Sequence, residues 1–143
     1  MIELDQRLPP GDDAQDTLSL PFDLRTKARQ RVRLGSGNEA AVRLGERGRP
    51  LRGGERLSGP SGLIVRVVAA PEAVSTVESA DPQQLARAAY HLGNRHVALQ
   101  VGAGFVRYQQ DHVLDDMVRS LGLSVRHEED GFEPEAGAYG GHG

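Results

Sequence analysis

The stretch DPQQLARAAYHLGN, residues 81–94, contains the clearest helix signals in the chain, together with one of its five histidines. Asp81 can cap a helix, and Pro82 suits the first helical position because that position needs no amide hydrogen. Leucine or alanine then recurs at helical spacing, at positions 85, 88, 89 and 92. Gly93-Asn94 is typical of a helix end. The stretch therefore predicts an amphipathic helix that begins at Pro82.

Short strand-like segments surround this helix and a second one. Alternation of apolar and polar residues predicts strands at residues 74–79, 97–101, 105–108 and 123–126. Asp111 can cap the second helix, whose apolar stripe runs from Val113 to Leu121. The order β-α-β-β-α-β is that of the ferredoxin-like fold. We therefore predict a ferredoxin-like domain over residues 73–130, followed by a flexible Gly-rich tail over residues 131–143.

Residues 1–72 predict a small antiparallel β domain, which gives the whole chain an α+β fold. Extended segments at 16–22, 40–44 and 63–70 are separated by loops rich in Gly and Pro. From residue 25 to residue 33 every second residue is basic: Arg25, Lys27, Arg29, Arg31 and Arg33. Because a strand sends alternate side chains to opposite faces, a strand here would carry one continuous basic face. That face is either solvated or a surface for a partner.

Composition narrows the functional classes. The chain of 143 residues has no Cys, which excludes disulfides and thiolate metal sites. It has neither a secretory signal nor an apolar run near the roughly 20 residues of a membrane span, so we expect a cytoplasmic protein without a membrane partner. Residues 1–72 carry a net charge of +2 and residues 73–143 a net charge of −5. The acidic half suits a cation better than nucleic acid.

All five histidines lie in the acidic half: His91, His96, His112, His127 and His142. Imidazole and carboxylate groups together suit nickel, copper or zinc. Because these histidines are scattered, a two-fold dimer is better able than one chain to surround a metal, since each residue near the axis then appears twice. Simpler interpretations remain open, with His91 bonding to its helix end and His127 merely solvated.

Two other functional classes compete with metal binding. His112 with Asp111 or Asp115 could form an acid–base pair in an enzyme, but no nucleophile motif accompanies them. Gly35-Ser36-Gly37 lacks the Lys-Ser/Thr that would follow in a phosphate-binding loop. A pure interaction module, in which the histidines are incidental, is the other alternative. A nickel titration distinguishes a metal-binding protein from an enzyme and from a pure interaction module.

Several blocks of residues resemble the UreE family of urease accessory proteins. They are AYHLGNRH at residues 89–96 followed by Gln100, DHVLDDM at 111–117 followed by Leu121-Gly122, FEPEAGAYGGHG at 132–143 and, more loosely, LRGGE at 51–55. The resemblance covers nearly the whole chain. It implies a peptide-binding-like N-terminal domain, a ferredoxin-like metal-binding domain and a homodimer that is not an enzyme.

The resemblance also implies a nickel metallochaperone that delivers Ni²⁺ to apo-urease, together with the urease GTPase UreG and other accessory proteins. His96 matches the ligand shared across the dimer, and His112 a more peripheral one. His142 in the tail, Asp111 and His91 complete the candidate metal ligands, and Zn²⁺ or Cu²⁺ could replace nickel. Two departures weaken the peripheral site, since many members have histidine where this chain has Gln109 and Gln110, and His142 is the only histidine of its tail.

Overall fold

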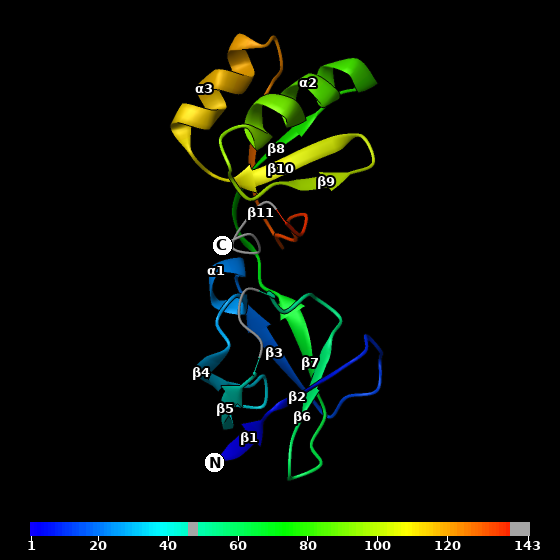
Figure 1. The fold of residues 1–143 in the computed structure, drawn as a ribbon, viewed down its shortest axis with the longest axis vertical. Coiled ribbons are helices and arrows are strands. Elements are labelled where there is room, and N and C mark those ends of the chain that lie inside the picture. Colours follow the sequence, from blue (N-terminus) through cyan, green and yellow to red (C-terminus); the bar gives the residue numbers. More distant parts are fainter. Residues whose placement is uncertain (46–48, 138–143) are drawn as a thin grey trace. The chain divides into compact units, whose positions relative to one another are not determined.

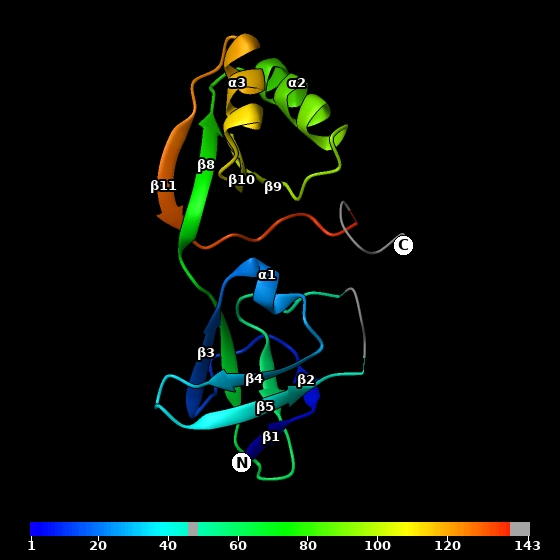
Figure 2. The same ribbon diagram turned by 90° about the vertical axis from the view of Figure 1, so that its left-hand side faces the viewer.

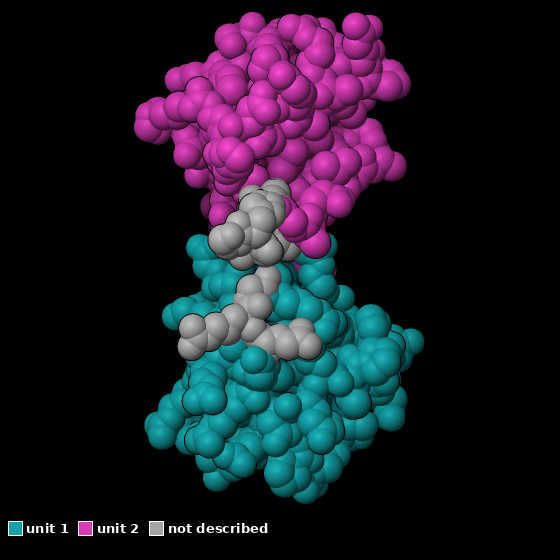
Figure 3. Space-filling model, viewed as in Figure 1, with its two compact units in different colours: residues 1–70 teal, residues 71–143 magenta. Residues whose placement is uncertain are grey.

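In the computed structural model of the protein, residues 1–45 and 49–137 are described. The chain divides into two compact units, Met1–Ala70 and Pro71–Gly143 (Figure 3). The two units have different architectures, and each is treated below by itself. Within the described residues no helix is long and apolar enough to cross a membrane.

The first unit is built mainly of short strands. In chain order its elements are β1 (Ile2–Leu4), β2 (Gln6–Leu8), β3 (Asp16–Leu20), α1 (Phe22–Arg25), β4 (Arg29–Arg33), β5 (Glu39–Arg43), β6 (Arg56–Ser58) and β7 (Val65–Ala69). They form two sheets, with the strand orders β1-β5-β4 and β2-β6-β7-β3. In Figure 2, β4 and β5 run across β3 and β7.

These sheets are mixed, although we expected antiparallel pairing throughout. β1 runs parallel to β5, with Ile2 beside Ala40, and β3 runs parallel to β7, with Asp16 beside Val65. Both parallel pairs join strands that are far apart in the sequence, where long connections permit either direction. The other pairs, β4 with β5, β2 with β6 and β6 with β7, are antiparallel.

One hydrophobic core joins the two sheets. Leu4 and Val42 come from the first sheet and Leu18 and Val65 from the second, and all four are fully buried in the same cluster. Burial of such side chains contributes roughly 1.5–3 kcal/mol each. The two sheets therefore stabilise each other as the layers of a small sandwich.

The predicted basic strand is shorter than expected, and Arg25 does not belong to it. Residues Phe22–Arg25 form the short helix α1, and only Arg29–Arg33 form a strand. Arg25 is 1% exposed, and it donates hydrogen bonds to the carbonyl oxygens of Leu20 (3.0 Å) and Leu51 (2.9 Å). Alternation of charge alone could not reveal this, because Phe22–Arg25 are helical and do not follow the alternation of a strand.

The second unit has the ferredoxin-like topology. Its elements are β8 (Glu72–Glu78), α2 (Pro82–Gly93), β9 (Gln100–Gly102), β10 (Phe105–Gln109), α3 (His112–Ser120) and β11 (Arg126–Asp130). The sheet order is β11-β8-β10-β9, and every neighbouring pair is antiparallel. Both helices cover the same face of this sheet (Figures 1 and 2). The predicted α+β class and its ferredoxin-like part are confirmed.

Both predicted helix caps are present. The Asp81 carboxylate accepts a hydrogen bond from the amide of Gln83 at 3.0 Å. The Asp111 carboxylate accepts from the amides of Val113 at 2.9 Å and Leu114 at 3.2 Å. Such caps stabilise a helix by about 1 kcal/mol, so the helix starts are determined by local sequence.

The last strand lies further along the chain than predicted. β11 covers Arg126–Asp130 instead of residues 123–126. Leu123 is buried in the hydrophobic core and Val125 packs against that core, both without belonging to a strand. Strand pairing begins only after these two residues, at the sheet edge, where polar side chains give no alternating apolar pattern.

The segment after β11 crosses the sheet face opposite the helices. The amide of Glu133 donates to the side-chain oxygen of Gln100 at 3.0 Å, and the amide of Glu135 donates to the carbonyl of Leu99 at 2.8 Å. Gln100 begins β9, whereas the segment starts at β11, on the opposite edge of the sheet (Figure 2). Glu133 and Glu135 therefore have hydrogen bonds to Gln100 and Leu99, within the segment where we expected a flexible tail from residue 131. His142 lies outside the described residues.

A test of the first unit compares two arginines. We expect Arg25→Met to lower the free energy of unfolding by about 1–3 kcal/mol, because it removes the guanidinium donor from the carbonyl of Leu51 and leaves the carbonyl of Leu20 with only the amide of Ala70. Arg29→Met, at an exposed position, should change it by no more than about 0.5 kcal/mol. Urea unfolding followed by circular dichroism gives both values. Equal losses in the two variants would contradict the structural role of Arg25.

Candidate metal centre

His96 has an unusual backbone conformation just beyond α2. The amides of Arg95 and His96 bond to the carbonyls of Leu92 (3.1 Å) and Gly93 (3.0 Å), which continues the turn of the helix. His96 then adopts φ +57°, and it is the one non-glycine residue with positive φ among those described. This left-handed conformation costs a non-glycine residue about 1–2 kcal/mol, and such strain gathers at functional sites.

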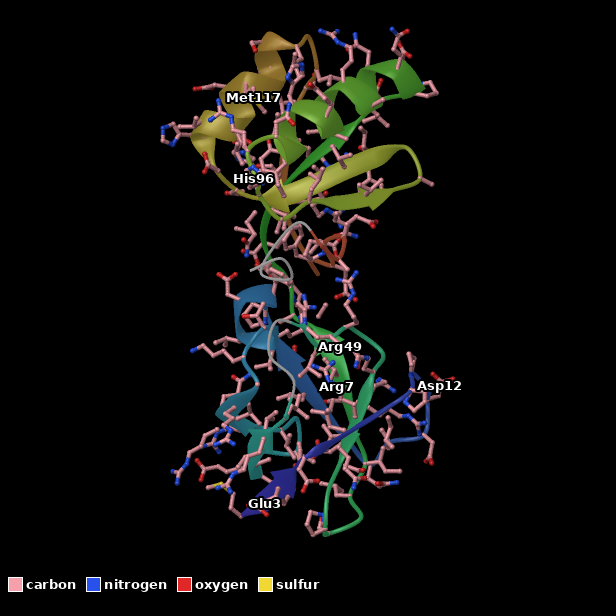
Figure 4. The ribbon with its side chains drawn as sticks, viewed as in Figure 1. Glu3, Arg7, Asp12, Arg49, His96 and Met117 are labelled. Atoms are coloured by element: carbon pink, nitrogen blue, oxygen red, sulfur yellow. The ribbon has the colours of Figure 1, made fainter. Side chains whose placement is uncertain are left out.

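The strained turn places His96 in an exposed position (Figure 4). The residues that follow it border a hollow of about 240 Å³. Val97 and Ala98 form part of its lining, and Gln109, Gln110 and Asp111 form another part. The connection after α2 and the start of α3 therefore meet at this hollow, which Asp111 lines and to whose lining residues His96 and His112 are adjacent in sequence.

Asp111 and His112 stand at the beginning of α3. Both residues are exposed, and Oδ1 of Asp111 is occupied as the helix cap. A metal at Asp111 would have to use Oδ2 or compete with the cap. His112, the first residue of the helix, is thus the better placed of the two candidates.

The remaining candidates are less favourably arranged. His91 is half-buried in the last turn of α2, and its ring meets that of Tyr90 edge-on, with centroids 5.2 Å apart. The amide nitrogen of Gln109 donates to Glu72 at 3.1 Å, and that of Gln110 donates to the carbonyl of Val74 at 3.2 Å. Both amides are therefore engaged with β8.

One chain does not enclose a metal with its described side chains. Within residues 1–45 and 49–137, no three His, Asp or Glu side chains lie close enough together to hold an ion. The described side chains of one chain therefore do not form a complete coordination site. His142 cannot be placed, since it is outside the described part.

A hydrogen-bonded cluster around the buried carboxylate of Asp115, in the first turn of α3, was not predicted. Asp115 is 2% exposed; its Oδ1 accepts from the hydroxyls of Ser75 (2.8 Å) and Tyr108 (2.6 Å). Nε2 of His127 is 2.7 Å from Oδ2. Asp115 is therefore paired with His127, in place of the acid–base pair with His112 considered above, and His127 is more than a solvated residue. The available signal in the sequence was the position of Asp115, an acidic residue next to Leu114 and Val118 of the apolar stripe, which indicates a buried carboxylate.

The hydrogen bonds of this cluster determine its charge. Burial alone would raise the pKa of Asp115, but the bonds from Tyr108, His127 and Ser75 outweigh it and hold the pKa below its ordinary value. Burial, together with the bond to Asp115, raises the pKa of the Tyr108 hydroxyl. Asp115 is therefore ionised and Tyr108 neutral near pH 7, and α3 is bonded to β8, β10 and β11.

Sequence comparisons agree with this two-part architecture. Residues 3–70 match the model of the UreE urease accessory protein, N-terminal domain, and residues 72–143 match that of its C-terminal domain. The urease accessory protein UreE of Pseudomonas putida strain W619 is 59% identical over 140 residues, which cover 97% of this chain and 86% of the relative. UreE of Alkalilimnicola ehrlichii is 58% identical over 141 residues (99% and 86%), and UreE of Enterobacter sp. strain 638 is 53% identical over 140 residues (97% and 91%).

The strain at His96 can be measured with two substitutions. We expect His96→Gly to be at least as stable as the unmodified chain, because glycine adopts positive φ without steric cost. His96→Ala should be less stable than His96→Gly by about 1 kcal/mol, because alanine retains the strain. Differential scanning calorimetry without metal compares the two variants directly. If His96→Ala were the more stable, the turn would not be strained.

Proposed function

The chain belongs to the UreE family of urease accessory proteins, and we propose that it is the nickel metallochaperone that delivers Ni²⁺ to apo-urease. Membership of the family gives it a role in urease maturation. The single observation that carries the metal assignment is His96, an exposed imidazole held in a strained turn. The second unit would carry the metal, and the first unit would bind a partner peptide.

The donor chemistry supports a transition metal. The chain offers imidazole and carboxylate groups and no thiolate, a set that suits nickel and also accepts zinc or copper. His96 would be the main ligand, with His112 as a weaker one. Asp111, His91 and His142 would contribute at most secondary contacts.

We propose that the working form is a homodimer with His96 of each chain bound to one central ion. Two observations support it. The described side chains of one chain do not form a group of three ligands, and a two-fold axis doubles every ligand near it. Tyr90, 65% exposed, and Val113, 48% exposed, adjoin His91 and His112. These apolar surfaces would be covered in such an interface.

A shared site with few protein ligands also suits transfer. Water would occupy the remaining positions, so a receiving protein could replace the ligands one at a time. Protonated imidazole cannot bind a metal ion, so acidification should favour release. The protein would thus hold nickel tightly enough to exclude free ions and still pass it on without catalysing a reaction.

The surface of β4 is the proposed contact for the accessory proteins, the GTPase UreG or the apo-urease complex. Arg33 pairs with Glu39 at 3.7 Å, and the neighbouring Arg43 pairs with Glu3 at 3.2 Å. Arg29 lies opposite Arg43, and like charges in such cross-strand pairs are unfavourable. A partner with acidic groups would relieve that repulsion.

The nickel site is tested by titration and by its stoichiometry. We expect one tightly bound nickel ion per dimer, and at most one or two weaker ions. His96→Ala should remove the tight ion and leave a folded dimer, because each dimer loses two ligands of the same site. Equilibrium dialysis at neutral pH, with the mass of the assembly measured in parallel, checks both.

A matched variant separates the two classes of ion. His112→Ala should weaken only the additional ions and leave the tight one. Unchanged tight binding by His96→Ala, or three or more tight ions per dimer, would show that the ligands are assigned wrongly.

The partner surface is tested in cells. The double variant Arg29→Gln, Arg31→Gln should reduce urease activation several-fold and leave nickel binding unchanged, because these side chains lie far in sequence from every histidine. Arg87→Gln, an exposed arginine of α2, is the matched control and should have no effect. Equal activation by the double variant and the control would exclude a partner role for β4.

A further inference from the structure

His127 is held in an arrangement that suits a second metal-binding position. Its Nε2 lies 2.7 Å from the Asp115 carboxylate; the Asp115 side chain is 3% exposed and that of His127 is 49% exposed. We propose that Nδ1 of His127 and the carboxylate of Glu129 bind a divalent transition-metal ion, nickel or zinc, with water in the remaining positions. This position is separate from the central site at His96 and does not depend on it.

The location of the ring proton follows from the partners of Asp115. Asp115 accepts from two hydroxyl groups at Oδ1, and Nε2 of His127 lies 2.7 Å from Oδ2, so in this acceptor cluster Nε2 supplies the hydrogen of the shared bond. In a neutral imidazole the other nitrogen, Nδ1, then has the free lone pair. No hydrogen bond to Nδ1 comes from the described part of the chain. Nδ1 is therefore available as a ligand.

The carboxylate that orients His127 is itself held in place. Ser75 in β8 and Tyr108 in β10 donate to Asp115, so the carboxylate cannot rotate without breaking buried hydrogen bonds. Histidines that bind metals usually donate their other ring N–H to such a carboxylate, which fixes the tautomer and makes the ligand more basic. Asp115 would act as a positioning residue for His127.

Glu129 supplies the second ligand by strand geometry. Residues 127 and 129 of β11 point to the same face, since side chains alternate along a strand. Their partners on β8 are the small residues Ser75 and Ala73, and β11 is the edge of the sheet. The pair therefore lies on an edge strand, and among the described residues no further strand pairs with β11 on its outer side.

The intervening residue, Glu128, faces the opposite side of the sheet. There it accepts from Arg107 at 3.3 Å and from Arg126 at 3.1 Å. Its carboxylate is thus already neutralised and separated from the proposed position. Glu128 and Glu129 are adjacent carboxylates on opposite faces, which provides a matched pair for a test.

The experiment uses the ¹⁵N-labelled full-length chain carrying His96→Ala, so that the central site makes no contribution. Long-range ¹H–¹⁵N spectra without metal should show His127 protonated on Nε2. Titration with Zn²⁺ should then shift the Nδ1 resonance of His127. Glu129→Gln should weaken this zinc binding about ten-fold, and Glu128→Gln should leave it unchanged. Asp115→Asn, if it folds, should weaken it by about 10–100-fold.

Three results would overturn the proposal: His127 protonated on Nδ1, an Nδ1 resonance that millimolar Zn²⁺ does not move, or equal weakening by Glu128→Gln and Glu129→Gln. The spectra of the chain with an intact Asp115 decide the matter even if Asp115→Asn does not fold. Tight nickel binding that survives His96→Ala would overturn the central site instead, without changing the signal of His127.

Discussion

The buried carboxylate of Asp115 joins α3 to three strands of the second unit, within one helical turn of the candidate ligands Asp111 and His112. A buried carboxylate is several kcal/mol unfavourable unless hydrogen bonds compensate it, and here three donors from three strands do so. α3 has only nine residues, so this cluster determines its position along the sheet. Asp111 and His112 lie within one turn of Asp115. Their position relative to His96 therefore depends on buried hydrogen bonds as well as on apolar packing.

Much of the fold could be predicted from local signals. Asp81 and Asp111 begin their helices as expected, because a cap is an interaction between neighbouring residues. The position of β11 was predicted wrongly, because an edge strand carries little apolar alternation. β6 was not predicted, because a strand of three residues is too short to show such a pattern. The parallel pairs of the first unit were also beyond prediction, because strand direction depends on contacts between distant segments.

The candidate site was only partly predictable. Spacing alone could not distinguish His96 from His91, and the resemblance to UreE made that distinction. The positive φ of His96 is an independent physical sign of the same residue, visible only in the structure. Asp115 and His127 were missed as a pair because they come together across α3 and β11. Arg25 shows the converse error, a charge in a basic pattern that proves to be a buried structural group.

The hydrogen bond from Glu135 to Leu99 has a consequence for the end of the chain. It holds Glu135 beside Leu99, which follows His96 by three residues and directly precedes the edge strand β9. His142 follows Glu135 by seven residues, and a fully extended chain of that length spans at most about 25 Å. A tethered ligand confined to so small a volume has an effective concentration in the millimolar range. For the ion proposed at His96, a histidine on so short a tether would compete with water more effectively than free imidazole at ordinary concentrations.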